Sequence, residues 1–164
     1  MDLNEFYKLF ARLTTFKKNV FHPLVWIHGN PTIGKNVYVG GFSEINAKGA
    51  RVNIGENCDI ASFVSINCAD SHKKCLGITN KNNCKSIVIE DHVFIGSHSV
   101  IKGGAYIGHH CVIASGTIVD GVKIPPYSLV SGNPMRVKKA YYKISVLRQC
   151  NCGKKLKRKN NEKR

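Results

Sequence analysis

Histidine carries the side chain best suited to proton transfer near neutral pH, and one histidine here stands in a setting that favours such chemistry. His72 lies near the start of a polar segment rich in lysine and asparagine, DSHKKCLGITNKNNCKS, which begins at Asp70. An imidazole ring titrates near neutrality, so it can take a proton from a substrate group and give it back. Asp70 stands two residues earlier and could orient the ring. This pattern marks His72 as the first candidate for proton transfer and Asp70 as a secondary one.

Cysteine and histidine can also bind metal ions, but their spacing here does not favour it. The seven cysteines form no C-x-x-C pair, and Cys150 and Cys152 have a single residue between them. An odd count without such a pair favours reduced thiols over a disulfide framework or a zinc site. His92, His98 and His110 occupy equivalent positions of a six-residue repeat, and we expect their side chains to diverge. The sequence therefore predicts no metal site within one chain.

The net charge of +15 is concentrated near one end of the sequence. Residues 136–164 hold 12 Lys or Arg and one acidic residue, which is typical of a mobile basic tail that contacts phosphates or an anionic membrane surface. The remaining residues are mildly basic and show no basic face interleaved with aromatic residues, so we expect no nucleic-acid partner. Neither a secretory signal nor an apolar run of about 18 residues occurs, and the expected location is the cytoplasm.

The elements that must position these side chains follow from a six-residue repeat. A large aliphatic residue recurs every sixth position in three series, the second offset by three residues from the first. The series are Ile27, Ile33, Val39 and Ile45; then Ile54, Ile60 and Ile66; then Ile89, Ile95, Ile101, Ile107, Ile113 and Val119. Six residues suit a short strand plus a corner, and three such units close one turn of a coil. Stacked coils bury the aliphatic side chains in a continuous column.

The corners and the interruptions of the repeat can be located as well. The third residue after each aliphatic is often of a type that tolerates positive φ. These corner residues are Asn36, Asn57, His92, Gly104, His110 and Gly116. Residues 1–18 are typical of an amphipathic helix, which we expect to cap the first coil. Residues 70–86 break the repeat and predict an outward loop, and residues 140–149 predict a short closing helix or strand.

The repeats carry a family resemblance. The stretches IGKNVYVGG, IGENCDIAS, IEDHVFIGSHSVIKGGAYIGHHCVIASGTIVDG and SGNPMRVKK resemble the hexapeptide-repeat acyltransferases, in particular the galactoside, maltose, xenobiotic and nucleotide-sugar acetyltransferases. The resemblance implies an all-β fold, a left-handed parallel β-helix that assembles as a homotrimer. It divides the chain into an N-terminal capping helix (1–20), a β-helix acyltransferase domain (21–139) with the loop 70–86, and a C-terminal closing segment and basic tail (140–164).

The resemblance also implies roles for individual residues. His72 corresponds to the general base that takes the proton of the acceptor group. Asn46 corresponds to an amide that holds the acceptor, and Glu44 precedes it by two residues on the same expected strand face. An equally open reading makes Asn46 a member of a surface amide ladder. Phe94 stands where many relatives have a tryptophan in the wall of the acceptor pocket.

Donor binding is implied by the same resemblance, with acetyl-CoA as the donor. The backbone N–H of Ser97 would stabilise the negative charge on the thioester oxygen. Ala114 and Ser115 would flank the pantetheine arm between two subunits. Three basic residues, Arg136, Lys138 and Lys139, would meet the phosphates or the adenine of coenzyme A, with the guanidinium group favouring Arg136.

The function expected from these features is an acetyl-CoA-dependent acetyltransferase. It would act on a hydroxyl or amino group of a sugar or a nucleotide-linked amino sugar, by direct attack and without a metal, in the synthesis of cell-surface polysaccharide or lipopolysaccharide. Two alternatives remain open. One is a non-enzymatic β-helix that serves in binding or assembly. The other is a metal hydratase like the γ-type carbonic anhydrases, whose H-x-x-x-x-H spacing is missing here.

Overall fold

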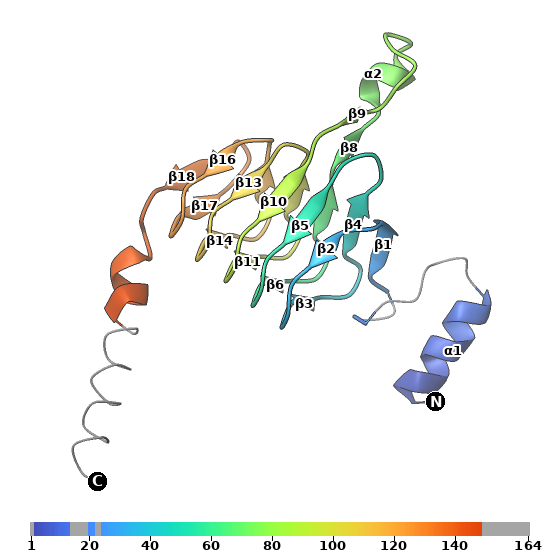
Figure 1. Ribbon diagram of the computed structural model, residues 1–164, viewed down its shortest axis with the longest axis horizontal. Coiled ribbons are helices and arrows are strands. Elements are labelled where there is room, and N and C mark those ends of the chain that lie inside the picture. The colour runs from blue at the N-terminus through green and yellow to red at the C-terminus, as the bar shows by residue number, and fades with distance from the viewer. Residues whose placement is uncertain (1, 14–19, 22–23, 149–164) are drawn as a thin grey trace.

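The chain winds into a three-sided coil of short strands. The computed structural model describes residues 2–13, 20–21 and 24–148. Helix α1 (Leu3–Leu13) lies at one end, and a short helical segment, residues 143–148, lies at the other (Figure 1). The strands stack into three sheets, one on each side of the coil. The expected left-handed parallel β-helix with a short N-terminal helix is therefore confirmed.

The first sheet has the strand order β1-β4-β7-β12-β15, and all its neighbours pair in parallel. Its strands are β1 (Trp26–Gly29), β4 (Glu44–Ala47), β7 (Ser65–Asn67), β12 (Val100–Lys102) and β15 (Ile118–Val119). Trp26 pairs with Glu44 and Val100 with Ile118, each 18 residues apart, which is one full coil. The outer face of this sheet carries the side chains on which the candidate site depends.

The second and third sheets complete the coil. The second consists of β2 (Thr32–Ile33), β5 (Val52–Ile54), β10 (Ile87–Ile89), β13 (Tyr106–Ile107) and β16 (Lys123–Ile124). The third consists of β3 (Tyr38–Val39), β6 (Asp59–Ile60), β11 (Phe94–Ile95), β14 (Val112–Ile113), β17 (Leu129–Ser131) and β18 (Arg136–Lys138). Strand β18 turns back and pairs antiparallel with β17, which ends the parallel stacking.

The core is a column of aliphatic side chains, as the repeat predicts. The side chains of the second and third series are at most 2% exposed, and burying each isoleucine stabilises the fold by about 2–3 kcal/mol. Ile27 and Ile33 are only half-buried, because they lie at the open end of the coil. The structure also continues the column past Val119 with Ile124 and Val130. The six-residue spacing breaks there because Ile107 pairs with Ile124 only 17 residues away.

The corners confirm the six predicted positions, all of which have positive φ. Three aromatic residues, Phe42, Phe63 and Tyr127, also sit at corners with φ of 61° and were not expected there. The rings of Phe42 and Phe63 stack with centroids 5.1 Å apart. Such stacking stabilises by about 0.5–1.5 kcal/mol, which offsets part of the cost of an unfavourable backbone angle.

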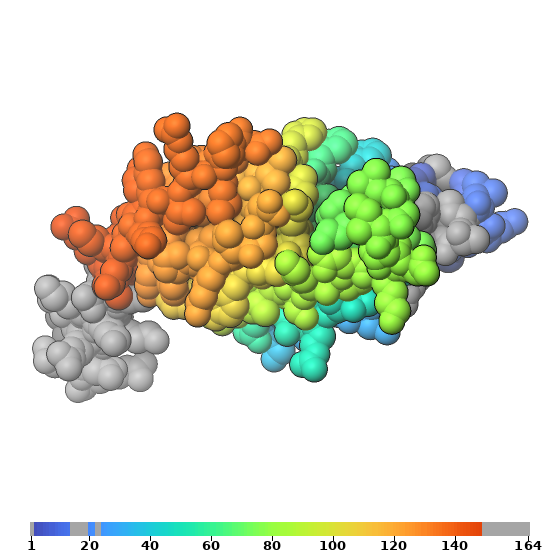
Figure 2. Space-filling view, turned by 90° about the horizontal axis from the view of Figure 1, so that it is seen from above, coloured from blue at the N-terminus to red at the C-terminus, as the bar shows by residue number. Residues whose placement is uncertain are grey.

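One excursion interrupts the coil, at the place where the repeat breaks. Ser65 pairs with Val100 across 35 residues instead of 18. The additional residues form strand β8 (Ala69–Asp70), helix α2 (His72–Cys75) and strand β9 (Asn83–Cys84). Strands β8 and β9 pair antiparallel, and the segment projects from the coil as a raised knob (Figures 1 and 2). The excursion therefore has secondary structure of its own.

The two ends of the chain are described in part. In α1 the rings of Phe6 and Phe10 stack on one face, and the Tyr7 hydroxyl donates a hydrogen bond to the carbonyl of Phe21. None of the residues of α1 is buried, so the capping of the first coil stays a prediction. Residues 14–19 and the basic tail, including Cys150 and Cys152, lie outside the described residues.

Candidate functional site

The imidazole ring of His72 is held at the base of the excursion by a carboxylate. Nδ1 of His72 lies 2.6 Å from Oδ1 of Asp70, and the same oxygen accepts a hydrogen bond from the His72 backbone N–H at 3.0 Å. Because a carboxylate only accepts hydrogen bonds, the ring hydrogen is on Nδ1. The lone pair of the neutral ring is therefore on Nε2, the nitrogen available to take a proton from a ligand.

The charge of Asp70 is stabilised by its surroundings. The backbone N–H of His72, followed by the His72 ring, lowers the pKa of this carboxyl from its ordinary value of 3.8, and Lys102 adds a smaller effect in the same direction. Both side chains remain accessible, with exposed fractions of 56% for His72 and 41% for Asp70. The pair can thus meet a ligand while Asp70 stays ionised at neutral pH.

A polar cavity of about 400 Å³ lies between the excursion and the first sheet. Strands β7 and β12 contribute Ser65, Asn67 and Lys102, and the excursion contributes Asp70 and Asn83. Its remaining lining residues are Cys68, Ala69, Ser71, Lys85, Val100, Gly103 and Asp120. Since Asp70 lines the cavity and holds His72, the proton acceptor stands beside a space that could hold a small ligand.

Two charged residues of this cavity were not among the candidates expected from the sequence. Lys102 forms an ion pair with Asp120, with Nζ 2.7 Å from Oδ1. These residues are 18 apart, so they lie one coil apart on neighbouring strands of the first sheet. A search for opposite charges at a spacing of 18 residues could have found the pair once the length of the coil was known.

Glu44 and Asn46 lie on the outer face of the first sheet, with fully buried Ile45 between them, as expected. The amide Nδ2 of Asn46 donates to Oδ1 of Asn67, at 3.2 Å, and Asn67 lines the cavity. Oε1 of Glu44 lies 3.5 Å from Nε2 of His28. Asn46 is thus part of an amide ladder that leads to the cavity, while its role in holding an acceptor stays a prediction.

The candidate donor residues Ser97, Ala114 and Ser115 lie together at the corner between the third and first sheets. A side chain on Gly96 would place its Cβ 2.5 Å from the backbone nitrogen of Ser115, so the two coils approach closely there. The carbonyl of Ser97 accepts a hydrogen bond from Gly116 at 2.9 Å. Among residues 24–148, no acceptor is bonded to the N–H of Ser97 or Ser115, which leaves both free to meet a ligand oxygen.

The three basic candidates lie near the end of the described coil. Arg136 and Lys138 belong to β18, beside β17, and Lys139 follows directly. All three side chains are exposed. The Lys138 ammonium group lies 5.8 Å from the centroid of the Tyr141 ring. These cations share an edge of the third sheet, but nothing in the geometry of one chain tests their role toward a phosphate.

Phe94 and His72 are not brought together within one chain. Phe94 lies on β11 of the third sheet, between Asp59 and Val112, and is 40% exposed. His72 belongs to the excursion, which leaves the first sheet. The two residues could line one pocket only if a neighbouring protomer supplies one of them.

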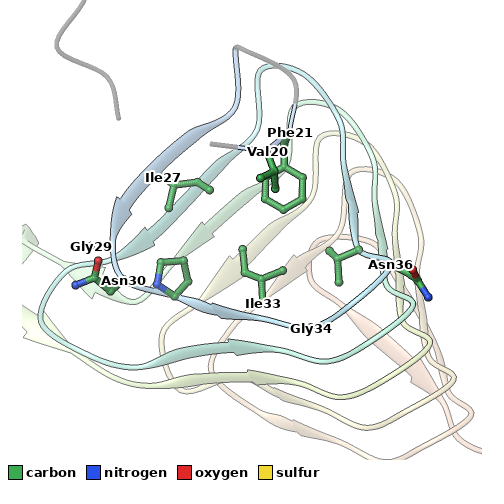
Figure 3. Close-up of a pocket in the computed structure, with 10 residues that line it drawn as sticks. Val20, Phe21, Ile27, Gly29, Asn30, Ile33, Gly34 and Asn36 are labelled. Carbon is green, nitrogen blue, oxygen red and sulfur yellow. The ribbon is translucent and has the colours of Figure 1, made fainter. Parts of the chain in front are cut away.

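A second cavity, of about 520 Å³, opens at the N-terminal end of the coil. The side chains of Val20, Phe21, Ile27 and Ile33 point into it, and no titratable side chain lines it (Figure 3). It is the uncovered end of the aliphatic column. Its apolar lining offers no group for proton transfer, so the polar cavity beside Asp70 is the better candidate site.

The expectation that three repeat histidines diverge is wrong for two of them. The rings of His92 and His110 stack, with centroids 4.7 Å apart. These residues are 18 apart and therefore occupy the same corner in neighbouring coils, whereas His98 stacks on Phe63 at another corner. Burial, followed by the charges of His92 and His109, lowers the pKa of His110. Within the described ranges, no three His, Cys, Asp or Glu side chains are grouped to hold a metal ion.

Comparison with known proteins agrees with the repeat and the fold. A family model described as bacterial transferase hexapeptide (six repeats) matches residues 86–121. The structure is similar to that of a galactoside acetyltransferase in complex with coenzyme A, at 33% identity and a TM-score of 0.64 over 74% of this chain and 60% of that one. No curated protein sequence matches the chain.

Two further solved structures resemble the chain. The polysialic-acid-specific acetyltransferase NeuO is 27% identical, with a TM-score of 0.58 over 70% of this chain and 60% of that one. The hexapeptide-repeat acetyltransferase VCA0836 from Vibrio cholerae is also 27% identical, with a TM-score of 0.60 over 85% and 81%. The chain thus spans 60% of the length of two of these three proteins. The resemblance to hexapeptide-repeat acetyltransferases is confirmed. No helix in the described ranges is both long and apolar enough to cross a membrane.

Proposed function

We propose that this hexapeptide-repeat chain is an acyltransferase that moves an acetyl group from acetyl-CoA to a hydroxyl or amino group of a sugar or a nucleotide-linked sugar. One observation carries the proposal: the His72–Asp70 pair, 2.6 Å apart, stands beside a polar cavity on a coil of hexapeptide repeats. The alternatives without catalysis leave this oriented imidazole unexplained.

The comparisons support the choice of donor and acceptor. The galactoside acetyltransferase was solved with coenzyme A, and VCA0836 was solved with acetyl-CoA. NeuO is described as specific for polysialic acid, which is a sugar polymer. A saccharide acceptor is therefore the class to test first for this chain, and we place the reaction in the assembly of cell-surface polysaccharide or lipopolysaccharide.

The proposed reaction uses the geometry of His72 directly. Nε2 removes the proton of the acceptor hydroxyl or ammonium group as that group attacks the thioester carbonyl. The free N–H of Ser97 stabilises the negative charge that develops on the carbonyl oxygen. When the carbon–sulfur bond breaks, His72 returns the proton to the departing sulfur. No acyl-enzyme forms, and Asp70 keeps the ring oriented throughout.

Assembly into a homotrimer is part of the proposal. Candidate residues lie on different faces of one chain, with His72 on the excursion and Phe94 on the third sheet. An aromatic stack of Phe42, Phe63 and His98 is exposed at the corner between these sheets, and both phenylalanines are about half exposed. Packing such a surface against a second copy would bury it and bring the two halves of the site together. Light scattering on the eluting protein should give three chain masses.

The decisive experiment measures the thiol released from acetyl-CoA with a panel of neutral, amino and nucleotide-linked sugars. Wild-type protein should release thiol with at least one acceptor. His72→Ala should lower kcat by about 10²–10⁴-fold, the range that a general base contributes, and should leave coenzyme A binding and the circular dichroism spectrum unchanged. Near-normal turnover by His72→Ala would remove this residue from the base role. Calorimetry without any coenzyme A binding would favour a non-enzymatic β-helix.

A further inference from the structure

The polar cavity has an unbalanced set of charges. Of its two carboxylates, Asp120 is paired with Lys102 and Asp70 is bonded to His72. Lys85 also lines the cavity, and within residues 24–148 its ammonium group has no carboxylate at ion-pair distance. The side chain is exposed, so an oxygen anion entering the cavity could reach it. One positive charge is therefore left for a ligand.

The excursion adds to this positive field. From Ser71 to Ile89 the sequence contains four lysines and no aspartate or glutamate. The lysines are Lys73, Lys74, Lys81 and Lys85. The excursion also supplies cavity-lining residues from both of its strands, Asp70 from β8 and Asn83 from β9. A concave site beside a segment of one charge sign concentrates ligands of the opposite sign.

The neutral lining residues suit the rest of a sugar. Ser65 and Asn67 on β7 and Asn83 on β9 carry hydroxyl and amide groups, which donate to and accept from sugar hydroxyls. The floor is rigid, because Ser65 and Asn67 belong to a strand paired on both sides. Lys102 is fixed on that floor by Asp120, which also raises the pKa of Lys102.

From these observations we propose that the acceptor carries an anionic group, a carboxylate or a phosphate ester, and that Lys85 binds it, with Lys102 supporting it from the floor. This inference rests on the proposed function, since it names the acceptor of the same site. A neutral sugar would leave the ammonium group of Lys85 without a partner, whereas a sugar acid would supply one.

The test uses two pairs of probes that differ in charge. N-acetylneuraminic acid and its methyl ester test a carboxylate, and N-acetylglucosamine 1-phosphate and N-acetylglucosamine test a phosphate ester. For at least one pair the wild-type KM should be about tenfold lower for the charged member, which corresponds to about 1.4 kcal/mol. Lys85→Gln should remove this preference by raising the KM of the charged probe alone. Lys123→Gln, on the second sheet beside Tyr106, is the matched control and should change neither.

The outcomes separate this inference from the proposed function. Equal KM values for both members of both pairs, or an equal effect of Lys85→Gln on charged and neutral probes, would overturn the anionic acceptor and leave the acetyltransferase intact. If no probe accepts an acetyl group, titration calorimetry with the same four probes decides the inference by itself. Binding of a charged probe that Lys85→Gln weakens would support it, and no binding, or binding that Lys85→Gln leaves unchanged, would overturn it.

Discussion

Asp70 and His72 form two hydrogen bonds through a single carboxylate oxygen, one to the backbone N–H at 3.0 Å and one to Nδ1 at 2.6 Å. The first bond sets the backbone at the start of α2, and the second sets the ring. The short spacing of two residues makes both possible at once. The excursion therefore presents an oriented imidazole although most of its side chains are exposed.

Replacing Asp70 by asparagine tests whether orientation of the ring matters. An asparagine amide can donate to Nδ1 and so favours the hydrogen on Nε2, the wrong nitrogen for a base. We expect kcat for acetyl transfer to fall on the order of tenfold or more, while the effect stays below the loss caused by His72→Ala. Steady-state kinetics at pH 7.5 measure this. An unchanged kcat for Asp70→Asn would show that the ring needs no carboxylate.

The pKa of Asp70 predicts how its contribution to stability depends on pH. Because the folded-state pKa lies below the ordinary value of 3.8, the ionised form is favoured in the folded chain. The stabilisation is therefore complete above that value and is lost as pH falls below it. The denaturant midpoints of wild type and Asp70→Asn should differ at pH 6 and converge near pH 2.5. A difference that persists in acid would assign the effect to something other than the carboxylate charge.

The buried cysteines should resist alkylation. Cys58, Cys68 and Cys111 are at most 2% exposed, and burial raises the pKa of each thiol, which lowers the fraction of reactive thiolate. Cys75 on α2 is exposed. Iodoacetamide at pH 8 followed by peptide mass spectrometry should label Cys75 in the native protein and the three buried thiols only after unfolding. Labelling of Cys68 as fast as Cys75 would mean that the base of the excursion opens readily.

The coil could be predicted because every unit must fill one inward position. Ile60, Ile95 and Ile113 lie in register on neighbouring strands, and each is fully buried, so the repeat in the sequence is the repeat in the core. The break after Val119 could not be recognised in the same way. A coil shortened by one residue keeps its packing in space while its spacing in the sequence changes.

The site could be predicted only where it is local in the sequence. The Asp70–His72 pair spans two residues, and its contact follows from that proximity. Contacts between coils depend on an 18-residue spacing that a search at six residues does not reveal. The stacked rings of His92 and His110 were missed for this reason, and so was the ion pair of Lys102 with Asp120.

The close approach of two coils at Gly96 gives a prediction that links packing to donor binding. Alanine at this position would bring its Cβ to 2.5 Å from the Ser115 nitrogen and 2.9 Å from its Cα, so the backbone must move. We expect Gly96→Ala to lower the free energy of unfolding by about 1–3 kcal/mol, as overpacking does. The same movement separates Ser97 from Ser115 and should raise the KM for acetyl-CoA.

Ala61 provides the matched control, because it follows Ile60 as Gly96 follows Ile95, one coil away. Ala61→Gly removes a methyl group from the equivalent position and should cost only about 0.5–1 kcal/mol, with no change in KM. Thermal unfolding and steady-state kinetics on both variants separate the two effects. A Gly96→Ala variant with an unchanged melting temperature but a raised KM would show that the alanine methyl group blocks the donor directly. Unchanged values of both would mean that the corner tolerates a wider spacing, and the N–H of Ser97 would then lose its proposed place in the reaction.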